Sequence, residues 1–146
     1  MQFVSVRLIT GDVARLAAFY EQVTGIAARR PAEQFAELVG PSCTLAIGSA
    51  ETMALFGTGA AVPASNRSAI LEFLVEDVDR EYDRVRKLPA PPEVVQRPTT
   101  MPWGNRSLLF RDPDGNLVNL FTPVTEAARA RLAVQAPVTA APSHSS

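Results

Sequence analysis

The first ten residues alternate in polarity, as the residues of a half-buried strand do. Val4, Val6 and Leu8 would pack under a helix, and Ser5, Arg7 and Ile9 would lie on the opposite face. Asp12 then offers a helix N-cap and Gly25 a C-cap. The apolar spacing between them therefore predicts a helix over 12–24.

Short strands are expected after this helix, separated by Gly, Pro and Ser. The candidate segments are Ile26–Arg30, Phe35–Val39, Cys43–Ile47 and Thr52–Phe56. Four candidates compete for three expected strands, so their pairing stays open.

The same order of elements begins again after a polar joint at 59–67. Residues 69–75 predict a strand that buries Leu71, Phe73 and Val75, and that leaves Ile70, Glu72 and Leu74 on the other face. Asp77 caps a second expected helix, which Pro89 helps to end.

The remaining chain predicts a hairpin and a tail. The prolines between Pro89 and Pro102 restrict that stretch to loop or edge strand. Residues 106–110 and 116–121 are the expected last strands, joined by a type I turn at 112–115. From about residue 125 we expect a short helix, and beyond 134 the Ala/Pro/Ser composition predicts disorder.

An internal repeat relates the two halves. A shift of 65 places Asp12 on Asp77, Ser5 on Ile70, and Met53–Phe56 on Val118–Phe121. One offset for three elements favours two β-α-β-β-β units, an α+β fold, over a chance match. The expected domain spans 1–124, with modules at 1–58 and 68–122.

Composition narrows the function. The 146 residues are 47% hydrophobic and 20% charged with a net charge of −1, so the chain is globular without an electrostatic case for nucleic acid. No apolar stretch or leader predicts a membrane span or export, and we expect a cytoplasmic protein. A single cysteine, Cys43, and a single histidine, His144, leave almost nothing for a disulfide, a zinc site or a catalytic triad.

Three stretches of the sequence carry a family resemblance. They are VRLITGDVARLAAFYEQVTGI, ILEFLVEDVDREYDRV and, above all, PWGNRSLLFRDPDGNLVNLF. Over residues 3–122 the chain resembles the vicinal oxygen chelate superfamily, which includes glyoxalase I, extradiol dioxygenases, and fosfomycin and bleomycin resistance proteins. The resemblance implies two βαβββ modules whose curved mixed sheets form a cup with the helices outside. It also implies a homodimer, whose modules pair within one chain or between two.

Metal-dependent relatives place a His, Gln or Glu ligand on the first and the last strand of each module. The positions that match in this chain are Ser5, Ala54, Ile70 and Asn119. One hydroxyl, two hydrocarbons and one amide cannot offset the lost hydration of a divalent ion. We therefore expect neither a metal nor another cofactor, and no Lewis-acid chemistry.

Side chains on the expected inner faces are the candidates for ligand contact. Arg7 and Glu72 are favoured as an internal ion pair, with the alternatives that one orients a polar ligand or that Glu72 is a general base. Trp103 is either a plug at the module junction or an aromatic platform at the mouth of the cup. The full candidate set is Ser5, Arg7, Phe56, Glu72, Trp103, Asn119 and Phe121.

The favoured function is a metal-independent protein of the bleomycin-resistance type. It would bind and sequester a small apolar or aromatic molecule, with antibiotic resistance as one role. Bleomycin itself is cationic and suits a nearly neutral chain poorly. One alternative is a metal-independent lyase or isomerase that uses Glu72 or Arg7. A second is a metal-dependent glyoxalase- or dioxygenase-like enzyme, which the residues at the ligand positions disfavour. A third is a dimerisation module with a vestigial cup.

Overall fold

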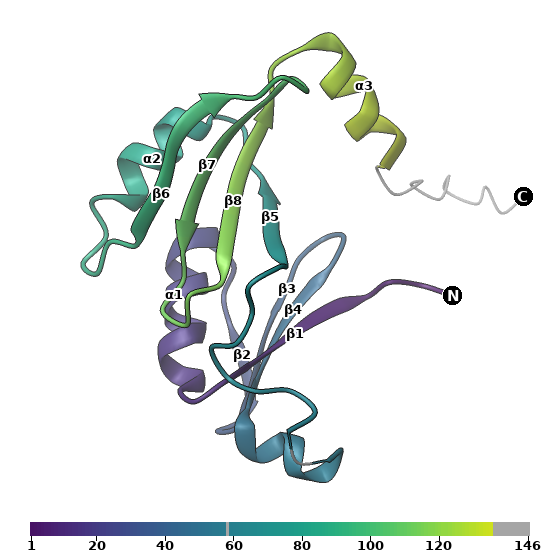
Figure 1. Ribbon diagram of the computed structural model, residues 1–146, viewed down its shortest axis with the longest axis vertical. Helices are drawn as coiled ribbons and strands as arrows, with labels where there is room; N and C mark the ends of the chain where they lie inside the picture. The colour runs from purple at the N-terminus through teal and green to yellow at the C-terminus, as the bar shows by residue number, and fades with distance from the viewer. Residues whose placement is uncertain (58, 136–146) are drawn as a thin grey trace, which may run out of the picture.

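The computed structural model describes residues 1–57 and 59–135, which form two curved, four-stranded mixed sheets. The helices α1 and α2 lie on the same side of the two sheets in Figure 1. The predicted α+β class is confirmed. Within the described residues, no helix is both long and apolar enough to cross a membrane.

The first module is a β-α-β-β-β unit. Its elements are β1 (Ser5–Thr10), α1 (Val13–Thr24), β2 (Arg29–Ala32), β3 (Phe35–Val39) and β4 (Thr44–Ser49). The strand order is β1-β4-β3-β2, and the first strand pairs in parallel with the last. The last strand of the module therefore lies beside its first strand.

The second module repeats this arrangement. Its elements are β5 (Ile70–Leu74), α2 (Val78–Val85), β6 (Glu93–Thr100), β7 (Asn105–Arg111) and β8 (Leu117–Pro123), and α3 (Glu126–Gln135) follows. The order β5-β8-β7-β6 makes the proline-containing β6 an edge strand, as expected. The expected disorder falls mostly in 136–146, which lie outside the described residues.

The helix ends form where the sequence predicts them. The Asp12 carboxylate accepts a hydrogen bond from the Arg15 amide at 3.0 Å, and Asp77 accepts one from Arg80 at 3.1 Å. Gly25 has φ 71° and its amide donates to the Glu21 carbonyl at 2.9 Å, which ends α1. Both aspartate caps and the glycine cap are therefore confirmed.

The prediction of a strand at Thr52–Phe56 is wrong. Residues Ala50–Leu55 form a 3-10 helix, η1, and the last strand of the first module is β4. The register places Ala46 opposite Arg7, as it places Asn119 opposite Glu72. The two last strands therefore correspond at an offset of 119 − 46 = 73 residues, not 65, so Ala46 replaces Ala54 as the equivalent of Asn119.

One position of the first expected strand is also corrected. Val4 lies before β1 and is 61% exposed, so it does not pack under α1. The strand begins only at Ser5, where its pairing with Thr44 on β4 begins.

A continuous buried core joins the two modules on the helix side of the sheets. It includes Leu16 and Tyr20 of α1, Ile47 of β4, and Phe110 and Leu120 of β7 and β8. Leu71, Phe73 and Val75 pack against this core as the alternation predicted. Because the core occupies one face of the second sheet, the residues between them in sequence face away from it.

Candidate ligand-binding face

The second sheet has an apolar face that turns away from α2, and we call it the open face. It carries alternate residues of β5, β7 and β8: Ile70, Glu72, Leu74, Leu109, Asn119 and Phe121. Ile70 is 48% exposed and Leu74 54%, whereas Phe73 between them packs into the core. Exposed large apolar side chains grouped on one surface are typical of a binding face.

A polar pair lies in the middle of the open face. The Asn119 side-chain amide donates a hydrogen bond of 2.8 Å to the Glu72 carboxylate, its neighbour in the strand register. Asn119 is only 8% exposed, and its carbonyl oxygen Oδ1 is buried with no hydrogen-bond partner among the described residues. A buried acceptor without a donor costs free energy, so a ligand donor that reaches this oxygen after a small shift of the Asn119 side chain would be favoured.

The ligand positions of the fold do not fit a metal ion. With Ala46 in place of Ala54, the four positions are Ser5, Ala46, Ile70 and Asn119, which offer one hydroxyl and one amide. Glu72 is the only carboxylate among the open-face residues, and it accepts from Asn119. In the described ranges, His, Cys, Asp and Glu side chains form no group of three or more placed to hold a metal.

Arg7 does not join this polar pair. Its guanidinium lies over the Phe35 ring, 5.6 Å from the ring centroid, on the first sheet. Glu72 bonds to Asn119 instead, and the ion pairs formed by the described residues do not include Arg7 with Glu72. The favoured sequence interpretation, an internal ion pair, is therefore wrong within one chain.

The candidate aromatic residues lie in different places. Phe121 lies on the open face, as the alternation of residues along its strand predicted. Phe56 follows η1 and is exposed, so it does not lie on a strand floor. Trp103 is 55% exposed in the turn before β7, and its carbonyl accepts from Arg131 of α3 at 2.5 Å. Trp103 is therefore not a buried plug, and its role as a platform stays a prediction.

Ser5 is exposed at the start of β1, opposite Thr44 in the register. It lies on the first sheet, so the structure does not bring it together with the Glu72–Asn119 pair. Sequence reasoning missed Leu109 and Ser107, which β7 places opposite Asn119 and Phe121. Only the register of the last hairpin, counted back from the turn at 112–115, could have identified them.

Comparisons with known proteins agree with this architecture. The family model described as Glyoxalase/Bleomycin resistance protein/Dioxygenase superfamily matches residues 2–120. A crystal structure of a glyoxalase/bleomycin resistance protein/dioxygenase from Nocardioides is 23% identical, with TM-score 0.70 over 86% of this chain and 85% of that chain. A family enzyme from Burkholderia phytofirmans PsJN is 18% identical, with TM-score 0.75 over 85% of this chain and 100% of that chain. No curated protein matches this chain in sequence.

Proposed function

The chain belongs to the Glyoxalase/Bleomycin resistance protein/Dioxygenase superfamily, and from that premise we propose that it binds a small apolar or aromatic molecule on its open face. Binding would need neither a metal nor a chemical step. Sequestration of an antibiotic or of a similar natural product is the role that this activity would serve.

One observation carries the proposal: an oriented polar pair in the middle of an exposed apolar surface. Ile70 and Leu74 flank Glu72 on β5, and Phe121 flanks Asn119 on β8. Apolar area buried by a ligand contributes roughly 25 cal/mol per Å² before the costs of association. A few fixed polar groups in an apolar surface are the usual composition of a small-molecule site.

The polar pair also specifies part of the ligand. Asn119 Oδ1 and the carboxylate of Glu72 are both acceptors. A ligand with a flat apolar body and one or two N–H or O–H donors would satisfy both. An apolar ligand without a donor would leave the buried oxygen of Asn119 unpaired and should bind more weakly.

A second copy of the chain is the proposed cover for the exposed apolar side chains of the two sheets. Val39 of β3 and Val95 of β6 are each at least 42% exposed in the single chain. Light scattering coupled to size exclusion would test this homodimer. A monomer at all working concentrations would contradict it without affecting the binding proposal.

The decisive experiment is a thermal-shift and calorimetric screen of neutral flat aromatic compounds, each with and without an N–H donor. A ligand at 100 times its Kd stabilises the folded state by about 2.7 kcal/mol. We expect Asn119→Leu and Glu72→Gln to weaken binding of the donor-bearing member of a pair. Glu76→Gln, an exposed carboxylate beside Arg80, is the matched control. Equal binding by all variants, or no binding by any compound, would refute the proposal.

Proton transfer by Glu72 is the second candidate function. The amide of Asn119 holds the Glu72 carboxylate in one orientation on an exposed surface, as a general base requires. Product analysis by NMR during incubation with each bound compound would detect turnover. Turnover that Glu72→Gln abolishes while binding persists would favour a lyase or isomerase over a simple binder.

A further inference from the structure

A second hollow lies between the two modules, mainly on the helix side of the sheets, and it shares Ile70, Glu72 and Leu74 of β5 with the open face. The first module lines it with the end of α1, from Val23 to Ile26, and with the loop Gly40–Thr44. The second module lines it with Ile70–Val75 and with Glu81 and Arg84 of α2. The volume of this inter-module cleft is about 780 Å³, within the range of small-molecule sites.

One wall of the inter-module cleft is a strand edge that pairs with no other strand among residues 1–57 and 59–135. In the order β5-β8-β7-β6, β5 is the terminal strand of its sheet. The amide of Val75 donates to the Phe121 carbonyl of β8 at 3.0 Å. Because successive residues of a strand direct their backbone groups to opposite sides, those of Ile70, Glu72 and Leu74 point away from β8 toward the cleft.

The opposite wall supplies apolar surface. Val6, Leu38 and Leu45 of the first sheet line it together with Val23 and Ile26 at the end of α1. An apolar wall facing a row of backbone donors and acceptors suits a molecule that has both apolar side groups and amides. Addition of a strand to a sheet edge is an established mode of peptide recognition.

Three charged residues line the cleft: Glu72, Glu81 and Arg84. The Arg84 guanidinium pairs with Glu81 at 2.6 Å, and it also donates to the carbonyls of Gln22 and Val23 at 2.9 and 2.6 Å. Arg84 therefore has little capacity left for an anionic ligand, and Glu81 little for a cationic one. Glu72 adds one negative charge, which accepts a hydrogen bond from the neutral Asn119 amide. The cleft therefore disfavours an acidic occupant and suits a peptide without acidic side chains.

We infer that the inter-module cleft binds a short, neutral, apolar peptide, or a compound with a peptide-like amide backbone, in extended form along β5. Five residues in extended form span about 17 Å, which matches the five-residue strand β5. The alternate amides of the ligand would pair with the free backbone groups of Glu72 and its neighbours. The peptide would use the backbone edge of β5, whereas a ligand on the open face would use the outward side chains of the same strand.

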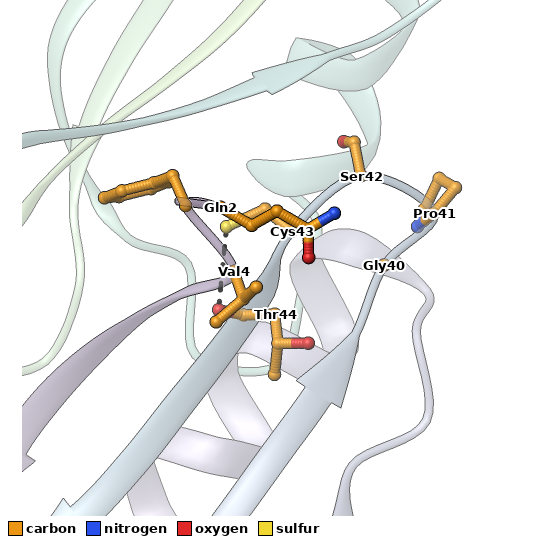
Figure 2. Close-up of a pocket in the computed structure, with 8 residues that line it drawn as sticks. Gln2, Val4, Gly40, Pro41, Ser42, Cys43 and Thr44 are labelled. Carbon is orange, nitrogen blue, oxygen red and sulfur yellow. Dashed lines mark hydrogen bonds between the residues drawn. The ribbon is translucent and has the colours of Figure 1, made fainter. Parts of the chain in front are cut away.

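Cys43 provides a specific reporter for this cleft. It is the only cysteine in the sequence, it is exposed, and it lies in the loop Gly40–Thr44 at the rim. The same loop borders a smaller hollow of about 360 Å³ beside Gln2 and Val4 (Figure 2). An occupant of the cleft should therefore slow the reaction of the unlabelled Cys43 thiol with a small maleimide.

The test uses the whole chain and a capped neutral pentapeptide in which three leucines alternate with two threonines. Two further versions carry N-methyl groups, one on the leucine amides and the other on the threonine amides. We expect saturable binding by the unmethylated peptide in calorimetry, and slower modification of Cys43 when the peptide is bound. One methylated version should bind about tenfold or more weakly, and the other nearly normally, because only one set of amides faces β5.

Two variants separate this site from the open face. Ser42→Trp places a bulky side chain at the exposed rim of the inter-module cleft and should abolish peptide binding. Ser65→Trp, at an exposed position of the joint, is the matched control and should bind normally. Asn119→Leu should lose binding of aromatic compounds but retain binding of the peptide. No peptide binding at about 1 mM, equal weakening by both methyl patterns, or unchanged binding by Ser42→Trp would overturn the inference.

Discussion

The phenol of Tyr20 on α1 donates a hydrogen bond of 2.6 Å to the carboxylate of Asp112, which lies 92 residues later in the turn before β8. The same carboxylate accepts from the backbone amides of Asp114 and Asn116 and from the Asn116 side chain. The turn of the second module is therefore fixed to the helix of the first by a fully buried side chain, Tyr20.

Removal of this phenol should destabilise the whole chain. Tyr20→Phe leaves the buried Asp112 carboxylate without one donor, and a hydrogen bond to a charged group contributes about 1.5–3 kcal/mol. Urea denaturation should show a loss of that size in the free energy of unfolding. Tyr82→Phe, at a half-buried ring under the Arg86 guanidinium, is the control and should change it little. Equal losses in the two variants would contradict the contact's importance.

The same contact predicts a dependence on alkaline pH. Burial raises the pKa of the Tyr20 phenol far above its ordinary value, and the nearby charge of Asp112 raises it further. Because the pKa of Tyr20 is higher in the folded state than in the unfolded state, its contribution to stability is complete below about pH 10. The contribution is lost as the pH rises above the pKa of the unfolded state, by up to about 1.4 kcal/mol per pH unit. The difference in unfolding free energy between wild type and Tyr20→Phe should therefore be constant from pH 6 to 9 and shrink above 10. A constant difference up to pH 12 would disprove this linkage.

An exposed ion pair should behave differently. Arg106 donates two hydrogen bonds of 2.8 Å to the Asp79 carboxylate, which holds the pKa of Asp79 below its ordinary value. The folded-state pKa is lower, so any contribution exists above about pH 4 and is lost as the pH falls through the folded value. Because both groups are exposed to solvent, Asp79→Asn should cost less than about 1 kcal/mol at pH 7, and high salt should reduce this loss. A loss as large as that of Tyr20→Phe would contradict the expectation.

Two glycines form a matched pair for testing the attachment of α3. Gly104 has φ 92° and Gly115 has φ 84°, so alanine is strained at both. A Cβ at position 104 would also overlap the Thr125 hydroxyl, which accepts from the Ala128 amide at the start of α3. A Cβ at position 115 would meet only the end of the Arg67 side chain, at an ordinary contact distance of 3.9 Å. Gly104→Ala should therefore destabilise by more than the ~1 kcal/mol expected of Gly115→Ala. Hydrogen exchange in α3 should rise only for Gly104→Ala, and equal effects would refute the steric argument.

Metal addition is the direct test of the ligand positions. Ser5, Ala46, Ile70 and Asn119 offer too few donors, so zinc, manganese, nickel or ferrous ions should cause no saturable rise in Tm. Treatment with a chelator should leave Tm unchanged. Elemental analysis that finds one metal per chain, held by these strands, would contradict the proposal of metal-free binding.

Local signals predicted the parts of the fold that local chemistry determines. Asp12 and Asp77 begin helices and Gly25 ends one, each through a contact with a residue no more than four positions away. The turn after Asp112 closes through the bond from the Gly115 amide to the Asp112 carbonyl at 3.0 Å. Such contacts depend on short sequence spacing, so they are recognisable in a single sequence.

Contacts between distant residues were not predictable in the same way. The stretch Ala50–Leu55 contains both helix-forming and apolar residues, and its state was decided by β4 taking the place beside β1. The 65-residue offset assumed that the elements have the same spacing in both modules. Equivalent residues of the two last strands, Ala46 and Asn119, are instead 73 positions apart. Arg7 and Glu72 occupy equivalent places on separate sheets, so a shared parity did not make them neighbours.

The open face was predicted in part. The alternation of β5 correctly placed Ile70, Glu72 and Leu74 on the side opposite the core. The bond between Glu72 and Asn119 was not foreseen, because it needs the parallel register of β5 with β8. Phe56 was misplaced together with its expected strand.

Because β1 pairs with β4 and β5 with β8, each half of the molecule completes its own hydrogen-bonded sheet. Cleavage of the chain within 59–67 would break no strand pairing in the described structure. The two fragments would then associate through their shared core. Hydrogen bonds from the side chains of Tyr20 in the first half and Arg84 in the second would also link them. The protein is thus suited to reconstitution from two separately expressed fragments, and their affinity for each other would directly measure how strongly the junction holds.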